Sequence, residues 1–382
     1  MNIEIFDLER IQSLYENKVD YNLTETGLHP YNLKELFDQE DIDQLAAVRL
    51  GYGQTDGADE LKETISRLYP GAGPANVLVT NGSAEANFIF TWSRLEPGDE
   101  LVLMLPNYMQ IWGLARSFGI IVKPFHLKEE LDWGLDFDEL RQQMTSKTKV
   151  IALCNPNNPT GAVLSEADMN RVVDLADKAD AWLYVDEIYR GAELQGQETP
   201  TFYGRYDKVV VNSGLSKAYG MPGLRIGWLV GPGEMIATGW AYHDYTTIST
   251  GILSQWIAHR VLQKEMRLKI LNRNRKMLRE NLDILKSWVE SHPDIFRRFI
   301  PPKAGAMAFV RYFMDINSRE LTTRLRQEKS VFVIDGDCFG MDHYIRIGFG
   351  SEKDYLLAGL ERIRRFLKKI SHEVTRRDTK EK

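Results

Sequence analysis

The clearest pattern along the chain is a series of short apolar runs, each ended by polar or turn-forming residues and separated by stretches with helical periodicity. Continuous apolar runs of this length, bounded by turns and alternating with helices, are typical of a parallel sheet that is buried on both faces. The pattern therefore predicts an α/β fold with a mostly parallel central sheet and flanking helices. The runs are Val77–Thr80, Leu101–Leu105, Val150–Cys154, Leu183–Val185, Val209–Val211 and Leu224–Val230.

The chain changes character after these runs. A long, charged stretch with helical periodicity covers about Ser254 to Ser291, and strand-like and helix-like runs follow it. That combination is typical of a separate α+β unit. We therefore expect a large domain over residues 46–280 and a small domain formed by residues 1–45 and 281–382. The later runs are Phe309–Tyr312, Val331–Ile334, Tyr344–Phe349 and Asp354–Ile370.

Polar residues of very different chemistry follow the ends of the strands in the first half of the chain. In parallel sheets, ligands bind beyond the carboxyl ends of the strands. The sequence thus predicts that these residues meet at one edge of the sheet and form one site. They are Asn81–Ser83, Tyr108, Asn155–Asn158, Asp186 and Ser213–Lys217.

Composition narrows the class of protein. The chain is 43% hydrophobic and 27% charged, which is ordinary for a globular protein, and its net charge of -6 argues against a nucleic-acid partner. The two cysteines, Cys154 and Cys338, lack metal-ligand spacing and suit a reducing cytoplasm, so we expect no metal. The sequence shows no signal-peptide pattern and no apolar run long enough for a membrane span.

The segment from Ser213 to Trp228 carries the most specific signal, with Lys217 just past one strand and Arg225 just before the next. It resembles the cofactor-lysine segment of fold type I pyridoxal-phosphate enzymes in the class I/II, aspartate-aminotransferase-like family. Three further segments match in the family's order, and the resemblance spans roughly residues 20–365. It implies pyridoxal 5'-phosphate as the cofactor. The three segments are Asn155–Gly161, Val185–Tyr189 and Tyr344–Gly348.

The resemblance implies that Lys217 forms an imine with the cofactor aldehyde. An amine that does so must shed its proton, which a cationic or desolvated neighbourhood promotes. Taken alone, this residue would be a surface lysine beside a turn. Asp186 is implied to face the pyridine nitrogen and keep it protonated, which makes the ring an electron sink; the plainer alternative is a helix N-cap.

Three more side chains are implied around the cofactor ring. Asn158 and Tyr189 would donate hydrogen bonds to the phenolic oxygen and favour its ionised form. Tyr108 would stack on the pyridine. The competing interpretations are an Asn-Pro turn for Asn158, a half-buried helix tyrosine for Tyr189 and a core tyrosine for Tyr108.

The cofactor phosphate needs backbone donors and a cation. A turn between a strand and a helix offers free N–H groups, and an arginine can add a two-pronged contact. The resemblance implies that the phosphate site includes Gly82, Ser83, Ala84, Ser216 and Arg225.

One position departs from the family pattern. Relatives often carry a hydroxyl residue three positions before the lysine, where this chain has Gly214, and we expect Ser213 to substitute. Tyr52 lies in a glycine-rich segment and resembles the residue that reaches the phosphate of a neighbouring subunit. This resemblance implies a homodimer with shared active sites; the alternative is an exposed aromatic residue in a loop.

Arg346 alternates with two isoleucines and therefore points away from their apolar face. The resemblance makes it the clamp on the substrate α-carboxylate, which suits the planar fork of an arginine; the alternative is a surface arginine on a strand. Asn158 and the backbone of Gly27 are implied at the substrate as well.

We therefore predict an aminotransferase that moves an amino group between an L-amino acid and a 2-oxo acid. Lys217, Asp186 and Tyr189 would be its catalytic residues, with Lys217 acting as general base and acid. A carbon-sulfur β-lyase would use the same electron sink and would release pyruvate and ammonia without an acceptor. A non-catalytic sensing module is a second alternative, for which this chain has no spare nucleic-acid-binding segment.

The substrate side chain is the least constrained feature. Dicarboxylate-specific relatives often present a second arginine where a loose alignment puts Tyr245. We therefore expect that aspartate and glutamate are not privileged by that contact, and that an apolar or aromatic side chain is accepted.

Overall fold

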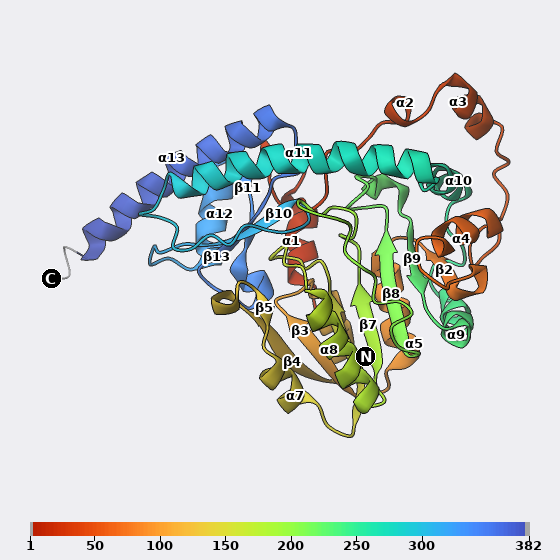
Figure 1. Cartoon of the computed structure of the whole chain (residues 1–382). Coiled ribbons are helices and arrows are strands. Elements are labelled where there is room, and N and C mark those ends of the chain that lie inside the picture. Colours follow the sequence, from red (N-terminus) through yellow and green to blue (C-terminus); the bar gives the residue numbers. More distant parts are fainter. Residues whose placement is uncertain (1–2, 379–382) are drawn as a thin grey trace.

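The computed structural model describes residues 3–378 and builds them around an eight-stranded sheet. The neighbouring strands from β8 to β4 in the list below run parallel, whereas β9 is antiparallel to both of its neighbours and β5 is antiparallel to β4. The predicted α/β fold with a mostly parallel sheet is confirmed. In spatial order the strands are β2 (Val77–Thr80), β9 (Gly227–Val230), β8 (Val209–Gly214), β7 (Trp182–Asp186), β6 (Thr148–Cys154), β3 (Glu100–Leu105), β4 (Ile121–Lys128) and β5 (Gly134–Leu135) (Figure 1).

Both faces of this sheet are buried under helices. Successive side chains of a strand point to opposite faces, and Leu78 and Val79 accordingly belong to two different apolar clusters. One cluster joins the sheet to α5 (Ser83–Arg94), α6 (Gln110–Ser117) and α9 (Gly233–His243). The other cluster joins it to α4 (Asp59–Ser66), α7 (Phe137–Gln143), α8 (Glu166–Lys178), α10 (Ile252–Val261) and α11 (Lys264–Glu290).

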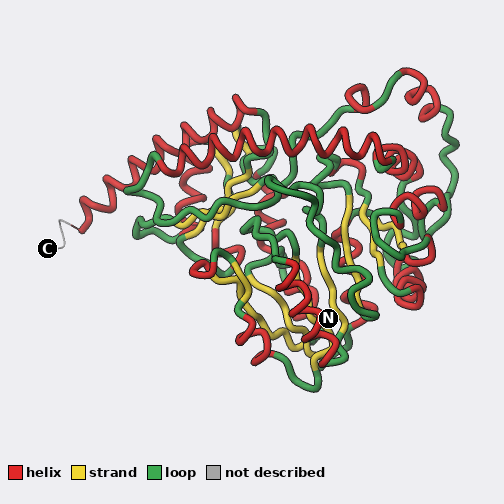
Figure 2. The backbone as a smooth tube through the Cα atoms, viewed as in Figure 1, coloured by secondary structure: helices red, strands yellow, loops and turns green. Residues whose placement is uncertain are grey.

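The rest of the chain forms a smaller α/β region at the other end of the long helix α11 (Figures 1 and 2). A three-stranded antiparallel sheet has the order β10 (Met307–Arg311), β13 (Tyr344–Gly348) and β12 (Ile334–Asp335). A second, parallel pair joins β1 (Tyr21–Asn22) to β11 (Val331–Phe332). Helices α1 (Asp7–Tyr15), α12 (Ser318–Lys329) and α13 (Lys353–Asp378) complete the region.

The β1–β11 pair decides where the N-terminal residues lie. Tyr21 is in register with Val331, so the first turns of the chain are attached to its C-terminal third. The predicted domain boundaries stay a prediction, and the boundary at residue 280 falls inside α11; residues 379–382 lie outside the described part. Two helices, α2 (Leu33–Leu36) and α3 (Gln39–Ala46), project from the body at the upper right of Figure 1.

Three details differ from the expected strands. The run predicted from Leu224 begins as a 3-10 turn followed by Arg225 at a φ of 53°, and the strand starts only at Gly227. The run Val331–Ile334 is divided between two sheets. Strand β4 was not predicted because Lys123, Pro124 and His126 interrupt its apolar pattern. Among the described residues, no helix combines the length and the apolar character that a membrane crossing needs.

Candidate active site

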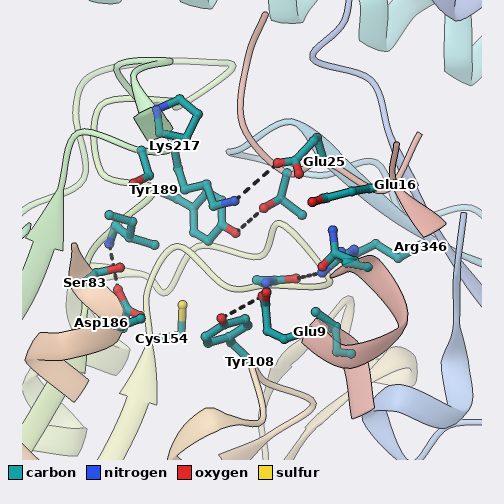
Figure 3. Close-up of a pocket in the computed structure, with 18 of the residues that line it drawn as sticks. Glu9, Glu16, Glu25, Ser83, Tyr108, Cys154, Asp186, Tyr189, Lys217 and Arg346 are labelled. Atoms are coloured by element: carbon teal, nitrogen blue, oxygen red, sulfur yellow. Dashed lines mark hydrogen bonds and ion pairs between the residues drawn. The ribbon is translucent and has the colours of Figure 1, made fainter. Parts of the chain in front are cut away.

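A pocket of about 310 Å³ opens beyond the carboxyl ends of β6, β7 and β8. Turns after the strands supply one wall, α1 covers a second side, and β13 contributes a side chain from the smaller region (Figure 3). The sheet edge predicted to gather polar residues is therefore the edge where the pocket lies. The predicted site residues that line it are Ser83, Ala84, Tyr108, Asn158, Asp186, Tyr189, Ser216, Lys217, Arg225 and Arg346.

Lys217 follows the end of β8 and extends its amine into the pocket (Figure 3). Its Nζ lies 3.7 Å from Oε2 of Glu25, and about a quarter of its side chain is exposed. Gly27 packs behind it: a Cβ at Gly27 would lie 3.0 Å from the carbonyl oxygen of Ser216 and 3.6 Å from Cδ of the lysine. The amine is thus reachable from the pocket while its stem is held from behind.

Asp186 is the last residue of β7 and is buried. Its Oδ1 accepts a hydrogen bond from the backbone N–H of Ile188 at 3.0 Å. Burial raises the pKa of this carboxyl to about 6, although the hydrogen bonds and the positive charge of Lys217 act in the opposite direction. A buried acid of this kind is stabilised as a carboxylate by a cationic group placed against it.

The turn between β2 and α5 is built to receive an anion. Gly82 has a φ of 85°, which favours glycine, and α5 begins there without a side-chain cap, so its first N–H groups are free to bind a ligand. A Cβ at Gly82 would collide with the guanidinium of Arg225, which lies directly over the turn. Ser83, Ala84, Ser216 and Arg225 all line the pocket at this end.

The residues before Lys217 explain the departure at Gly214. This glycine is paired with Gly227 of β9, and a Cβ would lie 2.7 Å from the carbonyl oxygen of Ile226. The close approach of β9 leaves no room for a hydroxyl side chain. Ser213 is buried on β8 and its hydroxyl donates to the carbonyl of Glu187 at 3.3 Å; it is not part of the pocket lining.

Arg346 is buried on β13, with only 1% of the residue exposed, so the alternative of a surface arginine is wrong. Its Nη1 donates to Oδ1 of Asn158 at 3.0 Å and its Nη2 to the carbonyl of Thr24 at 2.9 Å. Its Nε is buried and has no hydrogen-bond partner within residues 3–378. A buried, unpaired donor is costly, and the guanidinium therefore retains a donor for a ligand.

Two tyrosines, Tyr108 and Tyr189, also line the pocket. The Tyr108 hydroxyl donates to Oε1 of Glu9 at 2.8 Å, and the Tyr189 hydroxyl donates to Oγ1 of Thr26 at 2.8 Å (Figure 3). Burial raises the pKa of both phenols, so both remain protonated donors at neutral pH. Tyr108 also meets the edge of Phe6 at a centroid distance of 4.9 Å.

The remaining predicted residues lie outside the lining. Gly82 and Gly27 support it from behind, as described above. Tyr52 is 90% exposed on the segment between α3 and α4 and does not reach the pocket of its own chain.

Sequence reasoning missed the contribution of the N-terminal segment. Glu9, Gln12 and Glu16 line the pocket from α1 and the residue after it, and Glu25 and Thr26 line it from the loop after β1. The only signal was the spacing of three and four residues between the first three, which places side chains on one face of a helix. Such spacing is equally typical of a solvent-facing helix.

Comparison with known proteins agrees with this geometry. The family profile described as aminotransferase class I and II matches residues 32–363. Capreomycidine synthase from Streptomyces vinaceus is 28% identical, over 91% of this chain and 90% of its own. The (5-formylfuran-3-yl)methyl phosphate transaminase of Methanocaldococcus jannaschii is also 28% identical, over 97% and 98% of the two chains.

The fold has close counterparts among solved structures. A PLP-dependent aminotransferase from Streptococcus suis superposes with a TM-score of 0.91 at 32% identity, covering 97% of this chain and 99% of that one. Aspartate aminotransferase from Thermus thermophilus shares the fold with a TM-score of 0.85, at 24% identity over 96% and 97% of the two chains. The protein thus belongs to the class I and II aminotransferase family and is a pyridoxal-phosphate-dependent transaminase.

Proposed function

We propose that the pocket beyond β6, β7 and β8 is the active site in which this chain moves an amino group between an L-amino acid and a 2-oxo acid. The observation that carries the proposal is the convergence of Lys217, Asp186 and Arg346 on one pocket. An amine, a buried acid and a buried guanidinium are the groups needed to hold a pyridoxal ring and an amino-acid carboxylate next to each other.

The residues present fit the cofactor. The uncapped start of α5 and the guanidinium over Gly82 form a cradle for a phosphate, in which Ser83, Ala84 and Arg225 are the donors, and the Ser216 hydroxyl adds another. Ser213 donates elsewhere, so its predicted part in this cradle receives no support from its hydrogen bond.

The ring would be held from three sides. Asp186 is the counter-charge for a protonated pyridine nitrogen, and Tyr108 offers its face for stacking. The side-chain N–H groups of Asn158 are the donors for the phenolic oxygen, and Tyr189 would join them once its hydroxyl turns away from Thr26. Pyridoxal phosphate, when bound, supplies the electron sink that stabilises negative charge at the substrate Cα.

The remaining steps belong to the protein's own groups. Arg346 would bind the substrate carboxylate through the N–H groups that have no protein partner, with Asn158 beside it and the backbone of Gly27 next to Lys217. Nζ of Lys217 would hold the cofactor covalently between turnovers and, when free, would take up the Cα proton as general base and return it as general acid. Helix α1 closes one side of the pocket and would limit the access of water to this proton from that side.

A second copy of the chain would complete the site. Tyr52 and Leu50 are 90% and 79% exposed, and α3 buries none of its residues, which is unusual for an amphipathic segment without a partner. These observations support a homodimer in which Tyr52 reaches the phosphate of the neighbouring site.

Cys154 and Cys338 are free and buried, which suits the cytoplasm.

The test uses Lys217→Ala with Lys276→Ala, an exposed lysine of α11, as the matched control. We expect the absorbance band that depends on the covalent bond between Lys217 and the cofactor, and the formation of 2-oxo acid, to be lost in the first variant and retained in the second. Turnover that persists in Lys217→Ala would contradict the proposal. Pyruvate and ammonia from cysteine without any oxo-acid acceptor would instead favour the β-lyase.

A further inference from the structure

Three carboxylates line the active-site pocket on the side of α1. Glu9 and Glu16 are seven residues apart, with Gln12 between them, so all three side chains lie on one face of the helical segment. Gln12 is buried and is held by a hydrogen bond from its Nε2 to Oγ1 of Thr24 at 3.0 Å, which fixes this face toward the pocket. Glu25 lines the same pocket from the loop after β1.

The three carboxylates lie on the Arg346 side of the pocket, away from Ser83 and Asp186 (Figure 3). Their fields overlap: burial raises the pKa of Glu16 first, and the negative charges of Glu25 and Glu9 raise it further. Carboxylates whose charges act on one another in this way repel, and a cation placed between them removes the repulsion.

The three positively charged side chains that line the pocket already have other roles. Under the proposed function, Arg225 faces the phosphate, Arg346 faces the substrate carboxylate, and Lys217 either holds the cofactor or carries the Cα proton. Glu25 has its only ion pair with Lys217, at 3.7 Å, and Glu9 and Glu16 have none within the described residues. Once cofactor and substrate are bound, Glu9 and Glu16 have no positive partner among the described residues, and Glu25 has only Lys217, which is then engaged in proton transfer.

An independent feature places the substrate beside them. The buried Nε of Arg346 has no partner and marks where a carboxylate binds. The charges of Glu25 and Glu9 act on this guanidinium, which shows that they lie within electrostatic reach of it. An amino acid held by its carboxylate at Arg346 and by its amine near Lys217 lies in the same pocket as the α1 carboxylates, which are therefore available to its side chain.

We propose that the amino-acid substrate carries a positively charged group, an amine or a guanidine, at the end of its side chain, and that Glu9, Glu16 and Glu25 bind that group. This inference rests on the proposed function and names its substrate class. It replaces the expectation of an apolar or aromatic side chain, which followed from Tyr245 alone. An acidic side chain would meet three like charges, and an apolar one would leave them desolvated without compensation.

The experiment compares L-arginine with L-citrulline, which has the same length and shape but a neutral end group. Both are tested as amino donors to the holoenzyme with one fixed 2-oxo acid. We expect kcat/KM to be higher for arginine by roughly ten- to a hundredfold, the range for a charged hydrogen bond. The variants Glu9→Gln and Glu16→Gln should each lower the ratio of the arginine kcat/KM to the citrulline kcat/KM severalfold, because each removes one of the charges that the arginine side chain meets. The control is Glu280→Gln, an exposed acid of α11.

A binding measurement separates this inference from the proposed function. Calorimetry on the cofactor-loaded Lys217→Ala protein should give a dissociation constant for arginine well below that for citrulline, and Glu16→Gln in that background should equalise the two. Turnover of neutral amino acids with an arginine-to-citrulline ratio near one would overturn the substrate assignment and leave the transaminase intact. Tight, Glu16-dependent arginine binding without oxo-acid formation from any donor would uphold the recognition of charge and contradict the proposed reaction.

Discussion

Nη1 of Arg346 donates to Oδ1 of Asn158 at 3.0 Å, although the two residues are 188 positions apart. The bond ties β13 of the smaller region to the turn after β6 of the large sheet. The guanidinium is thereby fixed in orientation: two of its five N–H groups bind the protein, and the Nε–H and the second N–H of each Nη remain for a ligand. A side chain held in this way is pre-organised for a planar, two-oxygen group such as a carboxylate.

Arg346→Lys should therefore lower kcat/KM by the same factor for every amino-acid substrate. Lysine keeps the positive charge but lacks the planar guanidinium with its paired N–H donors, and it leaves Asn158 without its hydrogen-bond donor. Loss of such a buried charged contact costs ~2 kcal/mol or more. The corresponding fall in kcat/KM is roughly thirtyfold or more, measured with arginine and with alanine as donors. The ratio between the two donors should not change. A loss confined to one donor would show that Arg346 contacts the side chain instead of the common carboxylate.

Asp186 should make the cofactor-free protein less stable above about pH 6. Its pKa is raised from 3.8 to about 6 by burial, so the folded protein binds this proton more tightly than the unfolded chain does. Its contribution to stability is fully present below about pH 4 and is lost as the pH rises through 6. At pH 8 the ionised Asp186 lowers the free energy of unfolding by on the order of 3 kcal/mol relative to the value at low pH.

Asp186→Asn removes that titration and keeps an oxygen for the N–H of Ile188. Urea unfolding of the cofactor-free proteins should show the variant to be the more stable one at pH 8, with the difference shrinking toward pH 4. The same variant should lose transaminase activity, because no carboxylate remains to hold the proton of the pyridine nitrogen. A stability difference that is the same at pH 4 and pH 8 would mean that folding does not raise the pKa of Asp186.

The strand-end part of the site could be predicted from the sequence, because local signals mark it. Asp186 and Lys217 each follow an apolar run, and the chain after a buried strand must emerge at the same edge of the sheet. The large sheet itself followed from the same runs. In this sheet, β4 with its mixed composition and the two-residue strand β5 were missed, and β9, which follows a 3-10 turn, was placed too early.

The α1 part of the site could not be predicted, because it depends on contacts between distant segments. Its position follows from the two-residue pairing of Tyr21 and Asn22 with β11, some 310 residues later in the chain. No periodicity marks so short a strand. From the sequence alone, Glu9 and Glu16 therefore looked like solvent-facing residues. The structure shows that they line the pocket.

Gly214→Ser should destabilise the protein even though relatives often have a hydroxyl residue here. A Cβ would lie 2.7 Å from the carbonyl oxygen of Ile226, which is backbone and cannot move aside alone. Overpacking of this kind costs ~1–3 kcal/mol, which thermal unfolding should record as a lower Tm. Gly113→Ser on α6, where a Cβ meets nothing within 4 Å, is the control and should unfold at or above the wild-type temperature. Equal Tm values for the two variants would mean that β9 moves away from β8 more easily than its pairing suggests.

Arg225→Gln should weaken binding of pyridoxal 5'-phosphate and leave binding of pyridoxal unchanged. The guanidinium lies over the Gly82 turn, at the uncapped start of α5, and its own Nη1 is held by the carbonyl of Pro222 at 3.0 Å. Removing one charged contact to a phosphate lowers affinity by roughly tenfold or more. Titration of the cofactor-free protein with each compound gives the two dissociation constants, and Arg279→Gln, an exposed arginine of α11, is the control. If affinity for pyridoxal fell by the same factor, Arg225 would support the ring or the fold instead of the phosphate, and the anion cradle would have to be assigned to the α5 N–H groups and Ser216 alone.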